Sequence, residues 1–204
     1  MYNRVIRYIA LLIIVSGFWG LTGCSQQGLL TDKEKMYLDE ILGFAAAEEQ
    51  IEPIDFPTET ARKFPAVNKI FKVAGKEKDN YMFLVSPVGY RAPINMMVVI
   101  DADKNSVMGI KVLQQDETPE WGIWLGEEWF TNRFKGKSVD RYLKRALLEA
   151  EESNEIIQIT SATISTQAVI NGVNSAMGIY REAVLGEKAD PVPLKVEEYI
   201  TESQ

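Results

Sequence analysis

The segment with the clearest chemical potential is a run of hydroxyl side chains from Thr160 to Thr166, in which five of seven residues are Ser or Thr. It lies between an expected strand at 156–159 and an expected helix that stops at Gly186. Small residues at a strand-to-helix turn let the backbone approach a ligand, and the free N–H groups of the helix attract phosphate. Simple N-capping by Ser165 or Thr166 is the alternative, and spacing alone favours it.

A second segment, Glu117-Thr118-Pro119-Glu120-Trp121-Gly122, follows an expected strand that ends near Leu113. Trp121, Trp124 and Trp129 stand within nine positions of one another. Such aromatic side chains can stack on a planar ligand, but they also fill cores and lids. By composition alone the segment is suggestive of a ligand site and no more.

The composition excludes several kinds of site. The 204 residues include no histidine and one cysteine, so neither a Ser-His-Asp or Cys-His nucleophile nor a His/Cys zinc cluster can form. The chain is acidic, with a net charge of −7, which argues against nucleic acid as the main partner. Chemistry must therefore come from carboxylates, hydroxyls, lysines or a bound cofactor, and a metal site is not expected.

The N-terminus has the pattern of an export signal. Arg4 and Arg7 precede an apolar run from Tyr8 to Leu21, and the following Leu-Thr-Gly-Cys resembles a bacterial lipobox that ends at Cys24. We expect a lipid on Cys24, with an uncleaved transmembrane helix as the alternative. Both place the remaining chain on the extracytoplasmic side of a bacterial cell membrane. Without residues 1–23 the chain has 20 basic and 29 acidic residues, a net charge of −9.

The sequence patterns of the helices and strands that must position these residues predict an α+β domain. Thr31 to Glu34 has the capping-box pattern and opens a helix, whereas 52–60 contains two prolines and is expected to be a loop. Strands of a mainly antiparallel meander are expected at 67–74, 81–85, 94–100 and 107–113. Helices are expected at 126–134 and 139–153. The predicted divisions are a signal or anchor (1–23), a spacer and helix (24–60), a single domain (61–188) and a flexible tail (189–204).

The two segments together resemble a known family. The run Thr160 to Thr166 is similar to the Ser/Thr-Gly-Ala-Thr flavinylation motif of FMN-binding domains, found in the G subunit of Rnf complexes and the C subunit of sodium-pumping NADH:quinone reductases. Gly89-Tyr90, Gly109 to Leu113, Glu117-Thr118-Pro119 and Phe134 to Lys137 fall in the family's order. The resemblance covers roughly residues 67–184.

The resemblance implies a role for each matching residue. FMN would be attached through a phosphoester to Thr163, with Thr160, Ser161, Ala162 and Ser165 around it and Glu117 and Thr118 near the flavin. A separate flavin transferase would make the ester. The protein would relay electrons within a membrane redox complex, as a component like the Rnf G subunit, or as a free-standing carrier, and not as a self-contained enzyme. Lys111 could stabilise the reduced flavin, although an exposed strand lysine is the preferred interpretation.

The chain departs from the family's pattern after Glu117-Thr118-Pro119, where Glu120-Trp121-Gly122 replaces the usual Gly-Leu-Gly, and at two positions near the flavinylation motif. Ser161 replaces the motif's glycine, which tolerates left-handed backbone angles more readily than serine does. Ile157 stands where an acidic residue usually lies. These departures keep a second hypothesis open, in which the chain is a non-catalytic flavin-binding module or an envelope scaffold lipoprotein.

Overall fold

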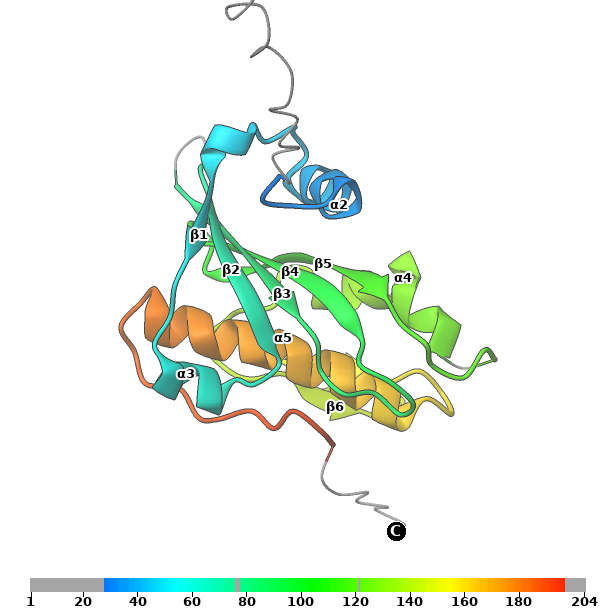
Figure 1. Cartoon of the computed structure of the whole chain (residues 1–204). Coiled ribbons are helices and arrows are strands. Elements are labelled where there is room, and N and C mark those ends of the chain that lie inside the picture. Colours follow the sequence, from blue (N-terminus) through cyan, green and yellow to red (C-terminus); the bar gives the residue numbers. More distant parts are fainter. Residues whose placement is uncertain (1–27, 76–77, 121, 197–204) are drawn as a thin grey trace, which may run out of the picture.

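A five-stranded antiparallel sheet forms the middle layer of the molecule (Figure 1). The computed structural model describes residues 28–75, 78–120 and 122–196. The strands run in the order β1-β2-β3-β4-β5, with bounds β1 Ile51–Ile54, β2 Val67–Val73, β3 Asn80–Val85, β4 Asn95–Asp101 and β5 Ser106–Gln114. The predicted α+β meander is therefore confirmed, with β1 added at its edge.

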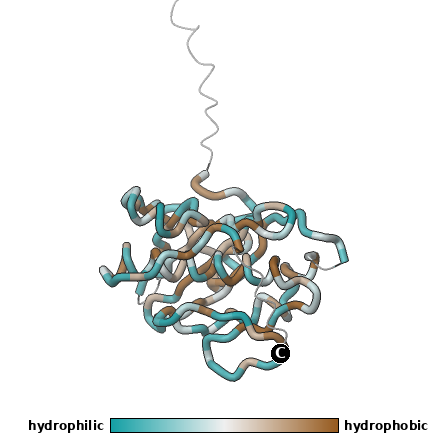
Figure 2. The backbone as a smooth tube through the Cα atoms, turned by 90° about the horizontal axis from the view of Figure 1, so that it is seen from below, coloured by the Kyte–Doolittle hydropathy of each residue, from teal (hydrophilic) through white to brown (hydrophobic). Residues whose placement is uncertain are grey.

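Helices cover both faces of this sheet. The long helix α5 (Thr163–Ala183) lies along one face, and α2 (Asp32–Leu42) lies across the other (Figure 1). Each face has its own core: Phe83, Val98 and Val173 belong to the α5 side, whereas Leu38 and Met82 belong to the α2 side. In Figure 2 the hydrophobic stretches of backbone lie mostly in the middle of the molecule, and the hydrophilic stretches lie mostly in its outer loops.

The start of α2 follows the predicted capping box. The Thr31 hydroxyl accepts from the Glu34 N–H, and the Glu34 carboxylate accepts from the Thr31 N–H at 2.8 Å. None of the helices within the described ranges is long and apolar enough to cross a membrane. The predicted signal at 1–23 and the lipidation site Cys24 lie outside the described residues.

The expectation of a loop at 52–60 is wrong. This stretch contains most of β1 and also the start of α3 (Thr58–Lys63). Its two prolines suit these elements, because Pro53 lies on an edge strand and Pro57 lies just before the first turn of α3. The boundary predicted at residue 61 falls inside α3.

The expectation of a helix at 139–153 is also wrong. The segment contains one short strand, β6 (Lys144–Ala146), which pairs in parallel with β7 (Glu155–Ile157). Asn174 of α5 fixes this irregular backbone, because its side chain accepts from the Leu143 N–H and donates to the Leu143 carbonyl. In place of the predicted helix there is thus a non-helical segment whose backbone is held by a side chain from a distant part of the sequence.

The region expected to be helical at 126–134 consists of three short pieces. They are the 3₁₀ turn η2 (Gly122–Gly126), α4 (Glu128–Thr131) and the 3₁₀ turn η3 (Asn132–Phe134).

Residues 189–196 are held more closely than a flexible tail would be. Ala189 and Val192 are buried, the Val192 N–H donates to the Lys63 carbonyl, and the Leu194 carbonyl accepts from the Val88 N–H. The expectation of a loose tail therefore fails for this stretch, and 197–204 lies outside the described residues.

The packing of α5 against α3 depends on a glycine. A Cβ on Gly178 would lie 2.3 Å from a ring carbon of Phe64 and 2.5 Å from the Tyr142 hydroxyl. We expect Gly178→Ala to destabilise the domain by about 1–3 kcal/mol through overpacking, despite alanine's better helix propensity. Urea unfolding measures this, with Gly126→Ala as control, because a Cβ there meets nothing within 4 Å. Equal stabilities of the two variants would contradict the prediction.

Candidate functional site

The hydroxyl run forms the turn from β7 into α5. Thr163 is the first residue of the helix, and Ala162 before it provides no side-chain cap. Ser165 and Thr166 lie inside the first turn, so the interpretation of them as N-caps is wrong. Thr166 instead accepts from the Ile159 N–H at 3.2 Å, which ties the helix back to the preceding chain.

Ser161 adopts the backbone geometry that the turn requires. Its φ is 65°, in the left-handed region where glycine is the usual residue. The serine that replaces the motif's glycine therefore occupies a glycine-like conformation and accepts some strain to do so. It lies next to Ala162, which is buried, and the turn keeps its compact shape.

Three backbone N–H groups at this helix start have no acceptor in the described part of the chain. The Ala162 N–H donates to the Ile159 carbonyl, and the Thr166 N–H donates to the Ala162 carbonyl at 2.8 Å. Among the described residues, no hydrogen-bond acceptor satisfies the N–H groups of Thr163, Ile164 and Ser165. The first turn also contains no acidic residue. This arrangement is suited to an anion, because the free N–H groups and the helix dipole both favour negative charge.

A cavity of about 360 Å³ opens beside this turn. Five predicted site residues line it, and they are Ser161, Ala162, Thr163, Ser165 and Thr118. Tyr90, Gly122 and Ile164 complete the lining. None of these three was a predicted site residue, although each lies in a motif that the sequence pattern singled out. Thr160 is exposed and does not line the cavity.

Glu117 lies beneath the cavity as a buried support. Its carboxylate accepts from the backbone N–H groups of Tyr90, Arg91 and Ala92 at 3.0–3.3 Å, and the Ser165 hydroxyl donates to it. Burial raises the pKa of Glu117, but these hydrogen bonds outweigh burial and lower the pKa overall. Glu117 thus joins the 89–92 turn to the first turn of α5, and it does not line the cavity.

Two glycines leave room for this carboxylate. A Cβ on Gly89 would lie 2.6 Å from the Glu117 Oε1 atom, and a Cβ on Gly122 would lie 2.0 Å from the Glu117 Cβ atom. Neither distance is possible without movement of the backbone, so both positions are closed to larger residues.

The aromatic segment lies at the surface. Trp124 and Trp129 are about half exposed, and Trp121 is outside the described residues. The Arg133 guanidinium stacks 4.9 Å from the Trp129 ring centroid and donates to the Ile157 carbonyl. Trp129 therefore serves the packing of α4 and not a core.

Lys111 points away from the site. Its ammonium pairs with Glu40 of α2 at 2.5 Å and lies over the Tyr37 ring, on the α2 face of the sheet. The interpretation of Lys111 as a strand lysine is supported, although its side chain is only 20% exposed, and a contact with the flavin is not.

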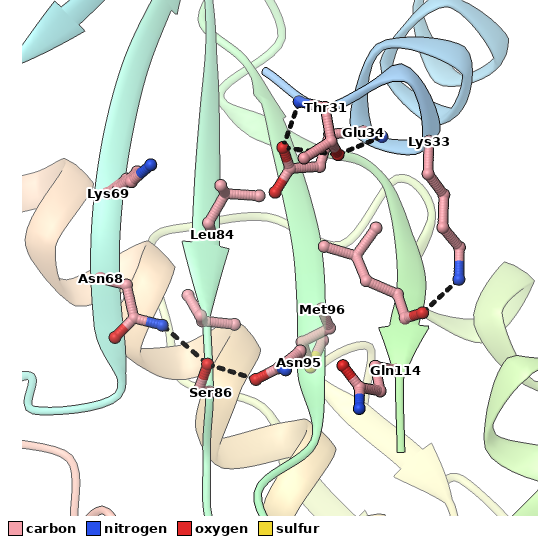
Figure 3. A pocket seen from close by; sticks show the side chains of 12 residues that line it. Thr31, Lys33, Glu34, Asn68, Lys69, Leu84, Ser86, Asn95, Met96 and Gln114 are labelled. Carbon is pink, nitrogen blue, oxygen red and sulfur yellow. Dashed lines mark hydrogen bonds between the residues drawn. The ribbon is translucent and has the colours of Figure 1, made fainter. Parts of the chain in front are cut away.

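A larger cavity, of about 510 Å³, lies on this α2 face (Figure 3). The side chains of Asn68, Ser86 and Asn95 form a hydrogen-bonded chain along one side of it, with Leu84 projecting into the opening. None of the predicted site residues lines it. The residues with the predicted chemistry therefore gather at the smaller cavity. No group of three or more potential metal ligands occurs among the residues described.

Known proteins resemble this chain over the region that contains the turn into α5. Residues 89–178 match the family model of the FMN-binding domain. The G subunit of the Na⁺-translocating ferredoxin:NAD⁺ oxidoreductase complex of Acetobacterium woodii is 34% identical over 94 residues, which cover 46% of this chain and 44% of the relative. The G subunit of the ion-translocating oxidoreductase complex of Methanosarcina acetivorans is 24% identical over 180 residues, 85% of this chain and 90% of the relative.

Solved structures share the fold. The C subunit of the Na⁺-translocating NADH-quinone reductase of Parabacteroides distasonis superposes with a TM-score of 0.57 at 17% identity, over 75% of this chain and 92% of that one. The chain spans about half the length of the first curated relatives that it matches. Residues 89–178 therefore match the FMN-binding domain family, and FMN is the cofactor that this match indicates.

Proposed function

We propose that this chain is an extracytoplasmic, membrane-anchored flavoprotein that carries FMN on Thr163 and relays electrons within a membrane redox complex of the Rnf or Nqr type. One observation supports this above the others: Thr163 begins α5 among three free N–H groups and lines a cavity with four other predicted site residues. The relatives are G subunits of membrane oxidoreductase complexes, which favours the other proteins of such a complex as partners.

The residues present suit the cofactor. A phosphoester at the Thr163 oxygen would lie at the free N–H groups of the first helical turn, which stabilise its negative charge. The cavity combines Tyr90 and Ile164 with hydroxyls, the mixture that a flavin ring and its ribityl chain need. FMN supplies the redox chemistry, and the chain binds and orients it.

The attachment of FMN to Thr163 is a group transfer and involves no oxidation or reduction. FMN is a simple monoester and is not activated, so a phosphoanhydride donor such as a flavin dinucleotide is required. The Thr163 oxygen forms the new P–O bond, the anhydride bond breaks, and a nucleoside monophosphate leaves. The hydroxyl proton passes to a base of the separate transferase that catalyses the transfer.

The anchor belongs to the same proposal. We place a signal or anchor at 1–23 and a lipid on Cys24, which would hold the domain against the outer surface of the cytoplasmic membrane. Mass analysis of the N-terminal peptide tests the lipid, because an acylated Cys24 and an intact apolar helix differ in mass.

The function is tested by co-expressing the full chain with a flavin transferase. We expect the protein band to fluoresce on a denaturing gel, and the purified protein to be reduced and reoxidised reversibly by chemical donors and quinones. The chain expressed without the transferase is the control, and its band should be dark. A dark band from co-expression, with a colourless native protein, would favour the scaffold hypothesis instead.

A further inference from the structure

Arg145 and the hydroxyl of Thr163 share one hydrogen-bond acceptor, the side chain of Gln158. Arg145 is the middle residue of β6, opposite Ile156 of β7, and the Gln158 N–H donates to the carbonyl of the neighbouring Ala146 at 2.9 Å. This pairing brings the Arg145 side chain to Gln158. The Arg145 Nη1 atom donates to the Gln158 Oε1 atom at 2.5 Å, and the Thr163 hydroxyl donates to the same oxygen at 3.3 Å.

The guanidinium of Arg145 has unused binding capacity. Its Nε atom is buried and has no hydrogen-bond partner within the part of the chain that the structure describes. No carboxylate of those residues lies within 4.0 Å of it either. The position before Gln158 is Ile157, so β7 offers no acidic side chain there. A buried N–H without an acceptor is costly, which indicates that an acceptor belongs to the working state.

We propose that Arg145 binds the phosphate of FMN, and that Gln158 holds the guanidinium and the Thr163 hydroxyl together until the ester forms. This inference rests on the proposed function. Once Thr163 is esterified, its oxygen has no proton to donate, so its hydrogen bond to Gln158 is lost. Because Arg145 and Thr163 share the Gln158 oxygen, the guanidinium would be the side chain that holds the new phosphate, and its planar donors suit phosphate oxygens.

The two sides of the phosphate would be held by different groups. The free N–H groups of Thr163, Ile164 and Ser165 come from the helix start, and Arg145 comes from the adjacent strand. The phosphodiester carries one negative charge, which one guanidinium balances. No acidic residue of the first helical turn competes for it.

The test compares Arg145→Met with Lys144→Met in the full chain co-expressed with a flavin transferase. Lys144 is the neighbouring residue of β6 and is exposed, so its variant removes the same charge from the same strand. We expect Arg145→Met to slow flavin incorporation about tenfold or more, because a charged hydrogen bond to phosphate is lost. Lys144→Met should incorporate flavin at the wild-type rate.

A second measurement separates phosphate binding from folding. The ³¹P chemical shift of the attached phosphodiester should move in Arg145→Met, and Arg145→Lys should restore part of the rate because it keeps the charge. Wild-type incorporation and an unmoved ³¹P signal in a folded Arg145→Met or Arg145→Lys protein would overturn the inference and leave the proposed function intact. A dark wild-type band would instead overturn the proposed function and this inference with it. If Arg145→Met fails to fold, the rate and shift of Arg145→Lys decide.

Discussion

Thr163→Ala should reduce the flavin fluorescence of the denatured protein band to background. The variant removes the oxygen that would form the proposed ester. Little else changes, because the Thr163 side chain is partly exposed and its one hydrogen bond within the described ranges is the long one to Gln158. Fluorescence on a denaturing gel and the intact mass of the protein measure the loss. The helix should remain, since Thr163 does not cap it through its side chain.

The neighbouring hydroxyls provide matched controls for this prediction. Thr160 lies in the same turn, is exposed and does not line the cavity, so Thr160→Ala should keep full fluorescence. Ser165 is buried and donates to Glu117, so its oxygen is already engaged and is a poor candidate for attachment. Fluorescence that survives in Thr163→Ala but disappears in Ser165→Ala would move the attachment to Ser165 and keep the family assignment.

The sequence predicted most of the fold because the signals involved are local. The capping box at Thr31 and the patterns of the four expected strands act over a few positions, and the structure confirms the box and a strand in each expected range. The predictions are wrong where the backbone conformation depends on residues far away in the sequence. The backbone near Leu143 follows the side chain of Asn174, and β1 depends on pairing with β2.

In the candidate site, too, the features that depend on local sequence were predicted, and those that depend on distant contacts were not. The sequence pattern indicated the turn and the Glu-Thr-Pro segment. The structure brings four predicted residues of the turn, and Thr118 of that segment, to one cavity. The sequence pattern did not indicate Arg145 or Gln158. Their contact depends on the parallel pairing of β6 with β7, and β6 lies in a segment that we expected to be helical. Nor did the sequence pattern show that Glu117 lies beneath the cavity, since that follows from donors at separate places in the chain.

Glu117→Ala should destabilise the domain by about 3 kcal/mol or more, because it leaves three backbone N–H groups and the Ser165 hydroxyl without their acceptor. Urea unfolding at neutral pH measures the free energy of unfolding. Glu120→Ala is the control, because Glu120 is exposed and lies in the same segment. The flavin yield of Glu117→Ala should fall as well, since the carboxylate joins the turn of Tyr90 to the first turn of α5.

Glu117 should also make the free energy of unfolding depend on pH in the acid range. The folded-state pKa of Glu117 lies below its ordinary value of 4.5, so its contribution is complete above that value and is lost as the pH falls through the lower folded value. Glu117→Gln should therefore weaken the wild-type loss of stability below about pH 4.5, which urea midpoints at successive pH values measure. An acid limb as steep in Glu117→Gln as in the wild type would mean that other carboxylates, such as Asp101 with its lowered pKa, control it. A weakened limb would instead mean that the charge on Glu117, through its bonds to the 90–92 backbone and Ser165, stabilises the fold beside the cavity.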